Sequence, residues 1–223
     1  WVETQLDPRW DNRNYSVIKM MNTKDNLIKQ LSWKTRYMSA SISPDGKSIA
    51  ATENTIDNRN SLVLINISSG KIFKTIPVPG NAYLQRPQWS DDGTKICMIY
   101  LANKGEGIIS FRLSDMSWET LISENADDYQ SAFLRHDSLF YVSSASGTEN
   151  IYVLTPDKKI RMLTNSRFGA TDLLLDGGMI VFSDYSSSGN NICFVNIPAD
   201  QPEKSFNASR SFFWQIILNL FYQ

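Results

Sequence analysis

Apolar and polar positions alternate over short stretches of this chain, and clusters of turn residues separate the stretches. Residues 37–43 and 48–52 are two such stretches, and Pro44-Asp45-Gly46 lies between them. Pro and Asp favour the first positions of a reverse turn, and Gly adopts the positive φ that the turn requires. The pattern therefore predicts a strand, a tight turn and a second strand.

The same arrangement recurs further along the chain, around Asp91-Asp92-Gly93, and the two turn glycines are 47 residues apart. Each repeat also contains a third and a fourth predicted strand. In the first repeat the four strands are expected at 37–43, 48–52, 62–67 and 71–76, and in the second at 85–90, 95–100, 107–113 and 118–122. A period of 40–50 residues with four strands in each unit is typical of a propeller blade.

Two weaker repeats and a partial one complete the pattern. The third repeat is expected at 131–134, 138–143, 150–154 and 160–163, with a turn, Arg135-His136-Asp137, that lacks glycine. The fourth is expected at 171–175, 179–183 and 191–197, without an obvious outer strand. Near the N-terminus, 15–20 and 27–31 are interpreted as the last two strands of a blade.

We therefore predict an all-β fold, a β-propeller of four-stranded antiparallel blades, with four recognisable repeats and a half. The predicted propeller occupies residues 1–200, with a half blade at 14–32 and repeats at 37–77, 83–123, 129–165 and 168–198. Residues 201–223 form a tail in which 212–222 are strongly apolar. This tail is interpreted as a closing strand, a short buried helix or the start of another domain. Either it closes the ring or the rest of the ring lies outside this chain, since an uncovered sheet edge would pair with other chains.

The segments Ser43–Lys47 and Pro87–Thr94 resemble the blade repeat of the TolB-like, WD-like propellers, which are of the six-bladed type. A similar repeat occurs in the tricorn protease and in the propeller domains of prolyl oligopeptidases. The resemblance implies the propeller fold, and it implies a location in the bacterial periplasm or on the outer cell surface. Ile42 and Trp89 occupy equivalent positions in the two repeats, and we expect both to face a neighbouring blade. Proteins with this repeat include scaffolds, surface proteins and non-catalytic parts of peptidases, so the resemblance defines function poorly.

Composition excludes several classes of function. The chain has 223 residues and a net charge of −1, which does not favour binding to nucleic acid or anionic lipid. It has no run of 18 apolar residues, so no membrane-spanning helix is expected. Because it begins at Trp1, we expect a processed product or a piece of a longer chain with other domains. Cys97 and Cys193 fall in apolar strands of different repeats, which predicts two buried thiols rather than a disulfide.

No pattern of catalytic residues is present, so we predict that the chain is not an enzyme. The only histidine, His136, lies in a turn, and the sequence has no Gly-x-Ser-x-Gly motif. One histidine and two distant cysteines do not form a zinc site, and the Asp91-Asp92 and Asp127-Asp128 pairs lack the spacing of a calcium loop. No metal or other cofactor is therefore expected. A sugar-cleaving propeller would need inward carboxylates, which the repeats do not carry at a regular position.

The segments that precede the inner strands are the candidate binding site, because in a propeller they open onto one mouth of the central channel. These segments combine aromatic side chains with charged ones, and Tyr and Arg are common anchors of interfaces. Alternatively, the tyrosines pack between blades and the charges are simply solvated. The candidate residues are Arg36, Tyr37, Tyr83, Gln85, Arg86, Asp128, Tyr129, Arg167 and Phe168.

The sequence thus favours a non-catalytic module of the bacterial cell envelope that binds a protein or peptide partner. The alternative is an auxiliary propeller that filters substrates for a larger peptidase or hydrolase whose catalytic domain is not in this chain.

Overall fold

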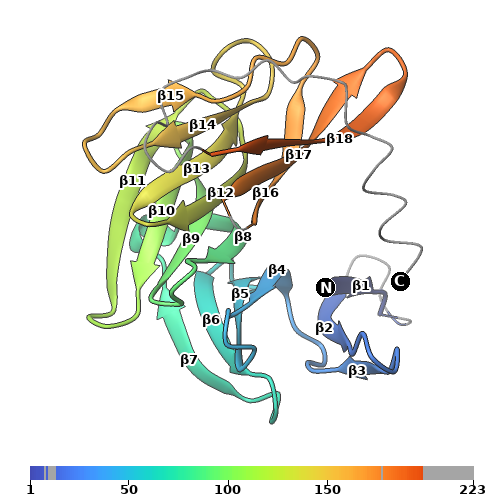
Figure 1. The fold of residues 1–223 in the computed structure, drawn as a ribbon. Coiled ribbons are helices and arrows are strands. Elements are labelled where there is room, and N and C mark those ends of the chain that lie inside the picture. The colour runs from blue at the N-terminus through green and yellow to red at the C-terminus, as the bar shows by residue number, and fades with distance from the viewer. Residues whose placement is uncertain (8, 10–13, 177, 198–223) are drawn as a thin grey trace. The chain divides into compact units, whose positions relative to one another are not determined.

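A computed structural model describes residues 1–7, 9, 14–176 and 178–197 (Figure 1). The predicted tail at 201–223 lies outside the described residues. Apart from one short 3₁₀ helix, η1 (Pro79–Asn81), the regular structure of the described residues is entirely β. The strands are β1 (Val2–Gln5), β2 (Tyr15–Met21), β3 (Ile28–Gln30), β4 (Tyr37–Ile42), β5 (Ser48–Asn54), β6 (Asn60–Asn66), β7 (Ile72–Pro77), β8 (Tyr83–Trp89), β9 (Lys95–Ala102), β10 (Gly105–Arg112), β11 (Ser117–Asn125), β12 (Tyr129–Arg135), β13 (Ser138–Ser143), β14 (Asn150–Leu154), β15 (Ile160–Met162), β16 (Ala170–Asp176), β17 (Met179–Ser186) and β18 (Gly189–Asn196).

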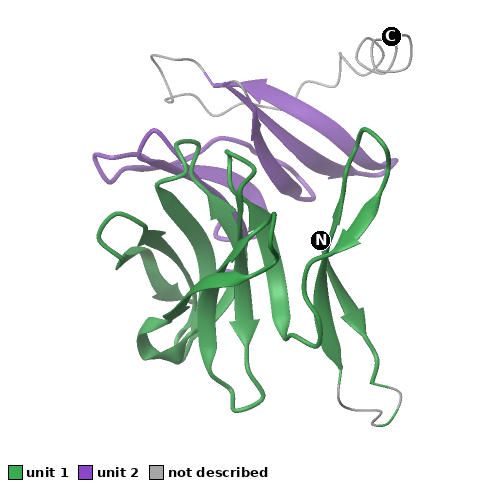
Figure 2. Cartoon of the chain, turned by 90° about the horizontal axis from the view of Figure 1, so that it is seen from below, with its two compact units in different colours: residues 1–126 green, residues 127–223 purple. Residues whose placement is uncertain are grey.

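These strands form five antiparallel sheets, each made of consecutive strands. Three sheets have four strands, β4–β7, β8–β11 and β12–β15, and the described parts of the first and last sheets, β1–β3 and β16–β18, have three. This is the blade arrangement of a propeller, so the predicted all-β fold class is confirmed. The chain divides into two compact units, residues 1–126 and 127–223 (Figure 2).

The N-terminal sheet differs from the sequence prediction. The hydrophobic pattern indicated two strands there, and the structure adds a third, β1, which pairs with β2 through Val2 and Ile18. Val2-Glu3-Thr4-Gln5 contains a single large apolar residue. A short strand with so little apolar character leaves no periodic signal in the sequence.

Sheets in the first unit pack face to face, because β6 in the middle sheet is apolar on both sides. In β6, Leu62 and Leu64 contribute to the core shared with the β8–β11 sheet. Val63 and Ile65 alternate with them and pack against Ile18 of the first sheet. All four of these β6 side chains are at most 1% exposed. A strand that is buried on both faces can be stable only between two other layers.

The predicted glycine turns have the expected geometry. Gly46 and Gly93 have φ values of 68° and 67°. In the first turn, Ser43 Oγ donates to Asp45 Oδ1 at 2.6 Å, and the same oxygen of Asp45 accepts the backbone N–H of Lys47 at 3.1 Å. Ser90 and Asp92 repeat the first of these contacts at 2.6 Å. These side-chain hydrogen bonds add to those of the backbone, in which the N–H of Gly46 donates to the Ser43 carbonyl at 2.9 Å.

The third repeat forms its hairpin turn without glycine. His136 and Asp137 have φ values of 45° and 59°, and Arg135 pairs with Ser138 across them. Positive φ at both central residues is the geometry of a two-residue type I′ hairpin turn, whose twist matches that of the flanking strands. The loss of glycine therefore changes the turn type and leaves the hairpin intact.

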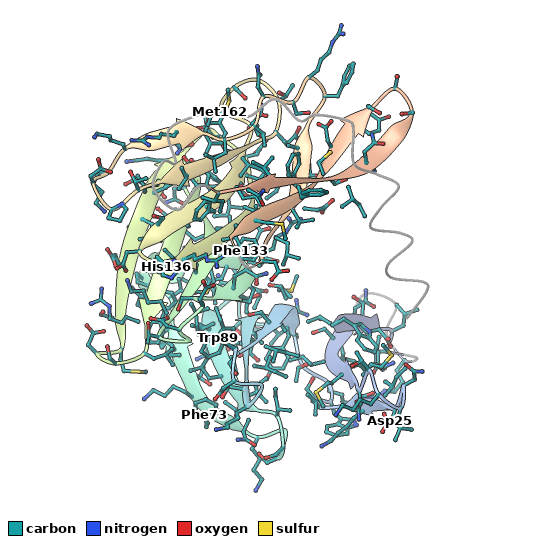
Figure 3. The ribbon with its side chains drawn as sticks, in the orientation of Figure 1. Asp25, Phe73, Trp89, Phe133, His136 and Met162 are labelled. Atoms are coloured by element: carbon teal, nitrogen blue, oxygen red, sulfur yellow. The ribbon has the colours of Figure 1, made fainter. Side chains whose placement is uncertain are left out.

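Trp89 and Ile42 do not share the environment that their equivalent positions predicted. Trp89, labelled in Figure 3, packs against the core between two sheets, and its indole N–H donates to the Ser41 carbonyl of β4 at 3.3 Å. Ile42 is 54% exposed, so the prediction is confirmed for Trp89 and wrong for Ile42. The reason is that Trp89 contacts β4, the inner strand of the preceding sheet. The three described strands of the first sheet provide Ile42 with no equivalent cover.

The two cysteines are both free. Cys97 is fully buried in β9, and this burial raises the pKa of its thiol well above the usual range. Cys193 in β18 is only half-buried, so the prediction of a buried thiol is wrong at this position.

Substitution of Gly93 by valine is expected to destabilise the protein by about 1–3 kcal/mol, because an L residue at positive φ is strained. Space is not the cause: the nearest atom to an added Cβ would be Pro44 Cδ at 3.7 Å. Urea denaturation measures the change in the free energy of unfolding. Gly93→Asn is the matched control, since Asn tolerates this conformation better. An equal loss in both variants would contradict the explanation.

Acid is expected to destabilise the protein partly through Asp92. Hydrogen bonds from the Ser90 hydroxyl and from the backbone and hydroxyl of Thr94 lower the pKa of Asp92 from 3.8 to about 2. Because the folded pKa lies below the unfolded value, this stabilisation is complete above pH 4 and is lost as the pH falls towards 2. Asp92→Asn should therefore lower the thermal midpoint at pH 7 and have a much smaller effect near pH 2. Asp91→Asn, which makes the same change in charge, serves as the control. A pH-independent effect of Asp92→Asn would refute the assignment.

Candidate functional site

The connections between successive sheets of the first unit lie at the same end as the β5–β6 loop. The backbone N–H of Asn54, at the end of β5, donates to the carbonyl of Arg36 at 3.2 Å, immediately before β4. The backbone N–H of Asn60, at the start of β6, donates to Asn81 Oδ1 at 2.8 Å. Both inter-sheet connections are therefore hydrogen-bonded to the same end of the β4–β7 sheet, where the β5–β6 loop lies.

The first connection, residues 32–35, is anchored by hydrogen bonds to β2 and the residues beside it. Ser32 Oγ accepts the backbone N–H of Ile18 at 2.8 Å, and Thr35 Oγ1 donates to the Ser16 carbonyl at 2.6 Å. Ser16 and Thr35 also form an isolated antiparallel bridge. Between these anchors, the side chain of Trp33 is 68% exposed. The loop thus holds a large aromatic side chain in solvent on an ordered backbone.

Cationic groups accompany Trp33. Lys34, which has a φ of 51°, places its ammonium 5.9 Å from the centre of the Tyr15 ring. The Tyr15 hydroxyl donates to Asp7 Oδ2 at 3.0 Å. Asp7 is buried, and a hydrogen bond from the backbone N–H of Arg9 is the main cause of its lowered pKa. The Arg9 side chain itself is 69% exposed. This part of the first unit therefore carries an exposed indole at Trp33, a cation at Lys34 beside Tyr15, and a second cation at Arg9 beside Asp7.

Asparagines hold the second connection, residues 78–82. Asn81, with a φ of 56°, accepts from the backbone of Asn60 and donates to the Asn58 carbonyl, both at 2.8 Å. Asn54 Nδ2 donates to the side-chain oxygens of Asn58 and Asn60 at 3.1 and 2.9 Å. Asn adopts left-handed backbone conformations more readily than most residues and bonds to nearby backbone groups. This network positions the chain as it enters β8.

The two predicted residues at the start of β4, Arg36 and Tyr37, are both at least partly buried against neighbouring strands. Tyr37 is only 2% exposed and belongs to the core between the first two sheets. Burial, and secondarily the charge of Glu53, raise its pKa to about 12. Arg36 is half-buried, and its Nε donates to the Asn54 carbonyl at 2.9 Å. Tyr37 therefore follows the alternative interpretation, in which the tyrosines pack between blades.

Arg86 is the most exposed of the predicted residues at the start of β8. It has a φ of 48° and lies in a β-bulge, where the register of β8 against β9 shifts between Gln85 and Gln88. Its backbone N–H donates to Ser39 Oγ of β4 at 3.0 Å. Gln85 Nε2 donates to Glu106 Oε1 at 3.3 Å, and burial raises the pKa of the half-buried Tyr83. Bulges redirect side chains and are frequent beside functional sites.

Similar register shifts occur in each of the inner strands β4, β8, β12 and β16. Met38 and Asp172, which are both exposed, lie in the bulges of β4 and β16. The sequence did not indicate these bulges, because a single extra residue does not interrupt the short apolar pattern.

In the second unit, Asp128 and Tyr129 have different environments. Asp128 is exposed, and its backbone N–H donates to Ser144 Oγ at 3.1 Å. Tyr129 is 7% exposed, and its ring centre lies 5.9 Å from that of Tyr141, which in turn stacks on Tyr152 at 5.5 Å. Burial is the main cause of the raised pKa of Tyr141. Tyr129 is therefore part of a buried cluster of three tyrosines.

Arg167 and Phe168 are both exposed and contact each other. The Arg167 guanidinium lies 5.3 Å from the centre of the Phe168 ring, and Phe168 is 51% exposed. Their connection is anchored much like residues 32–35: Thr164 Oγ1 accepts the backbone N–H of Ile151 at 2.9 Å, as Ser32 Oγ accepts that of Ile18. Each unit thus has an ordered connection that displays an aromatic side chain next to a cation.

Trp33 is the principal residue that sequence analysis missed. It lies three residues before the predicted Arg36, in the polar segment Ser32-Trp33-Lys34-Thr35. A single large aromatic residue within a polar connection was the signal that would have identified it.

Groups with catalytic potential are sparse in the described part of the chain. His136 is exposed in the tight turn between β12 and β13, where Figure 3 labels it. Among the described residues, no three His, Cys, Asp or Glu side chains come close enough to hold a metal ion. A search of the same residues for helices that are long and apolar enough to cross a membrane found none.

Comparison with known proteins gives similarity in structure only. No protein-family model matches the sequence, and no curated protein matches it. The structure of TolB from Acinetobacter baumannii is similar over 88% of this chain and 50% of that chain, with a TM-score of 0.69 and 18% identity. Putative TolB from Agrobacterium tumefaciens is similar over 88% of this chain and 77% of that chain, with a TM-score of 0.63 and 16% identity.

A peptidase is also similar. The puromycin-hydrolyzing peptidase of Mycobacterium tuberculosis matches 85% of this chain and 33% of that chain, with a TM-score of 0.60 and 15% identity. The chain therefore spans about half the length of the first TolB and a third of the peptidase. At sequence identities this low, the structural similarity shows the fold but not the activity. The chain has the β-propeller fold found in TolB and in this peptidase.

Proposed function

We propose that this chain is a non-catalytic propeller module that binds a protein or peptide partner through the connections preceding its inner strands. The observation that carries the proposal is the exposed aromatic side chain on an ordered connection, Trp33 in the first unit. A loop whose backbone is already anchored loses little conformational entropy on binding. Trp and Arg are also the residue types that dominate interface energetics.

The side chains on these connections indicate which kind of partner they could bind. In the first unit, Trp33 is accompanied by Lys34, and Arg86 is exposed on β8. In the second unit, Phe168 is accompanied by Arg167, while Asp128 supplies a negative charge. Aromatic groups with both signs of charge suit a polypeptide better than a polyanion such as nucleic acid. Tyr37 and Tyr129 are excluded from direct contact in this proposal because both are buried.

The proposed setting is the bacterial cell envelope, in the periplasm or on the outer surface. Support comes from the TolB-like repeat in the sequence and from the structural similarity to TolB. The net charge of −1 gives no independent attraction to anionic membranes or nucleic acid.

The second candidate is an auxiliary propeller that filters substrates for a larger peptidase. The similarity to the puromycin-hydrolyzing peptidase favours it. The two proposals differ in their ligand: the first requires a folded partner or a specific segment, whereas the second requires unfolded peptides of many sequences. Binding of a mixed set of fluorescent peptides, selected only for length, would favour the second.

A double variant, Trp33→Ala with Arg86→Ala, is expected to fold normally and to lose partner binding. Both side chains are exposed, so the free energy of unfolding should change by less than about 0.5 kcal/mol for each. Loss of two interface anchors should weaken binding by at least about 10-fold. The measurement is affinity capture from a bacterial envelope extract, followed by titration of the captured protein.

Phe73→Ala is the matched control for this experiment. Phe73 is also an exposed aromatic residue, 55% exposed, but it lies on the outer strand β7 near the β6–β7 turn (Figure 3). The proposal requires that Phe73→Ala retains capture. Normal capture by the Trp33→Ala, Arg86→Ala protein would show that these connections are not the binding site.

A further inference from the structure

The last sheet, β16–β18, has one packed face and one exposed apolar face. On the packed face, Leu173, Ile180 and Phe182 are at most 4% exposed and belong to the core of the second unit. On the opposite face, Leu174, Val181 and Phe194 form a row across the three strands, because Val181 pairs with both of the others. The exposed large apolar residues of this face are Leu174 at 53%, Met179 at 36%, Tyr185 at 54%, Ile192 at 67% and Phe194 at 39%.

The third strand of this sheet differs from its counterparts. In the three four-stranded sheets, the third strands β6, β10 and β14 are buried on both faces over most of their length. In β18 the residues alternate between half-buried and exposed. Ile192 and Phe194 are nevertheless as apolar as the residues of a fully buried strand. A contiguous apolar face of this kind is unusual on the surface of a soluble monomer and indicates a missing cover.

The sequence that follows β18 has the composition of such a cover. After the described residues end at 197, the chain continues for 26 residues to Gln223. Residues 211–223 contain no Asp, Glu, Lys or Arg, and nine of the eleven residues at 212–222 are large and apolar. A segment with this composition would be strongly disfavoured in water, just as the exposed face of the sheet is.

The segment between β18 and the apolar residues 212–222 is long enough for those residues to reach the exposed face of the sheet. Fourteen residues, 198–211, separate the described chain from the apolar segment. Fully extended, they span about 46 Å, compared with about 27 Å for the eight residues of β18. The apolar segment can therefore return along the whole length of the sheet.

We propose that residues 212–222 cover the exposed face of the β16–β18 sheet within the same chain. The contact joins two apolar surfaces that are linked by a short tether, so it forms without the translational entropy cost of bringing in a second molecule. This inference is independent of the proposed partner-binding function, which concerns the connections before the inner strands.

A photo-crosslinking experiment on the full chain tests the proposal. Ile192 is replaced by p-benzoylphenylalanine, and the crosslinked peptides are identified by mass spectrometry after irradiation. The expected product is an intramolecular crosslink to residues 212–222 at monomer mass. Position 73 is the control, because Phe73 is similarly exposed but lies on β7 in the first unit. A crosslink from position 192 to a second copy, or to no part of 212–222, overturns the proposal.

A second measurement uses an apolar fluorescent dye. Trp214→Asp with Ile217→Asp in the full chain should prevent the segment from covering the sheet, and dye fluorescence should rise several-fold. Adding Ile192→Thr and Phe194→Thr to that variant should largely abolish the increase, because the uncovered face would then be polar. If dye binding is equal in the original chain and the Trp214→Asp, Ile217→Asp variant, the segment does not cover an apolar face.

Discussion

Burial of both faces of the third strands β6, β10 and β14 is the constraint on which the rest of the structure depends. Strands such as β6, with Leu62 and Leu64 on one side and Val63 and Ile65 on the other, cannot be stable at a surface. The sheets must therefore pack face to face, and only their edges and connections are left for recognition. This explains why the exposed aromatic residues Trp33 and Phe168 lie in connections. It also explains why the exposed face of the β16–β18 sheet stands out as an exception.

Recognition from the edges requires that the connections are ordered. In this protein the order comes from short polar side chains that bond to the backbone of the adjacent sheet. Ser32 accepts from the amide of Ile18 in β2, and Thr164 accepts from the amide of Ile151 in β14. Asn81 connects the β7–β8 segment to the start of β6. These contacts account for the left-handed backbone conformations at Lys34 and Asn81, which the surrounding hydrogen bonds stabilise.

Sequence analysis predicted most strands correctly because each carries a local signal. Alternating apolar residues and the Asp-Gly turns identified β4, β5 and their repeats, and β13 and β14 match the predicted ranges residue for residue. The turn at His136 and Asp137 is also where it was expected. The strand β1 was missed because it is short and polar, and the bulges were missed because they depend on pairing between strands.

The candidate site was harder to predict, because position in a connection does not determine exposure. Tyr37 and Tyr129 follow polar connections in the same way as exposed residues do, yet both are buried. Whether such a side chain turns inward depends on the space left by the neighbouring sheet, which the sequence does not encode locally. Arg86 and Phe168, two of the predicted binding residues, are exposed, and Trp33 was overlooked next to Arg36.

The proposed binding function requires that the connections before the inner strands are rigid. Hydrogen exchange of the free protein, followed by mass spectrometry of short peptides, measures this rigidity. We expect the amides of Ile18, Thr35 and Asn60, which donate to the connections or lie in them, to exchange as slowly as those of the neighbouring strands. Exchange of these amides at the rate of an unstructured loop would show that the connections are not rigid.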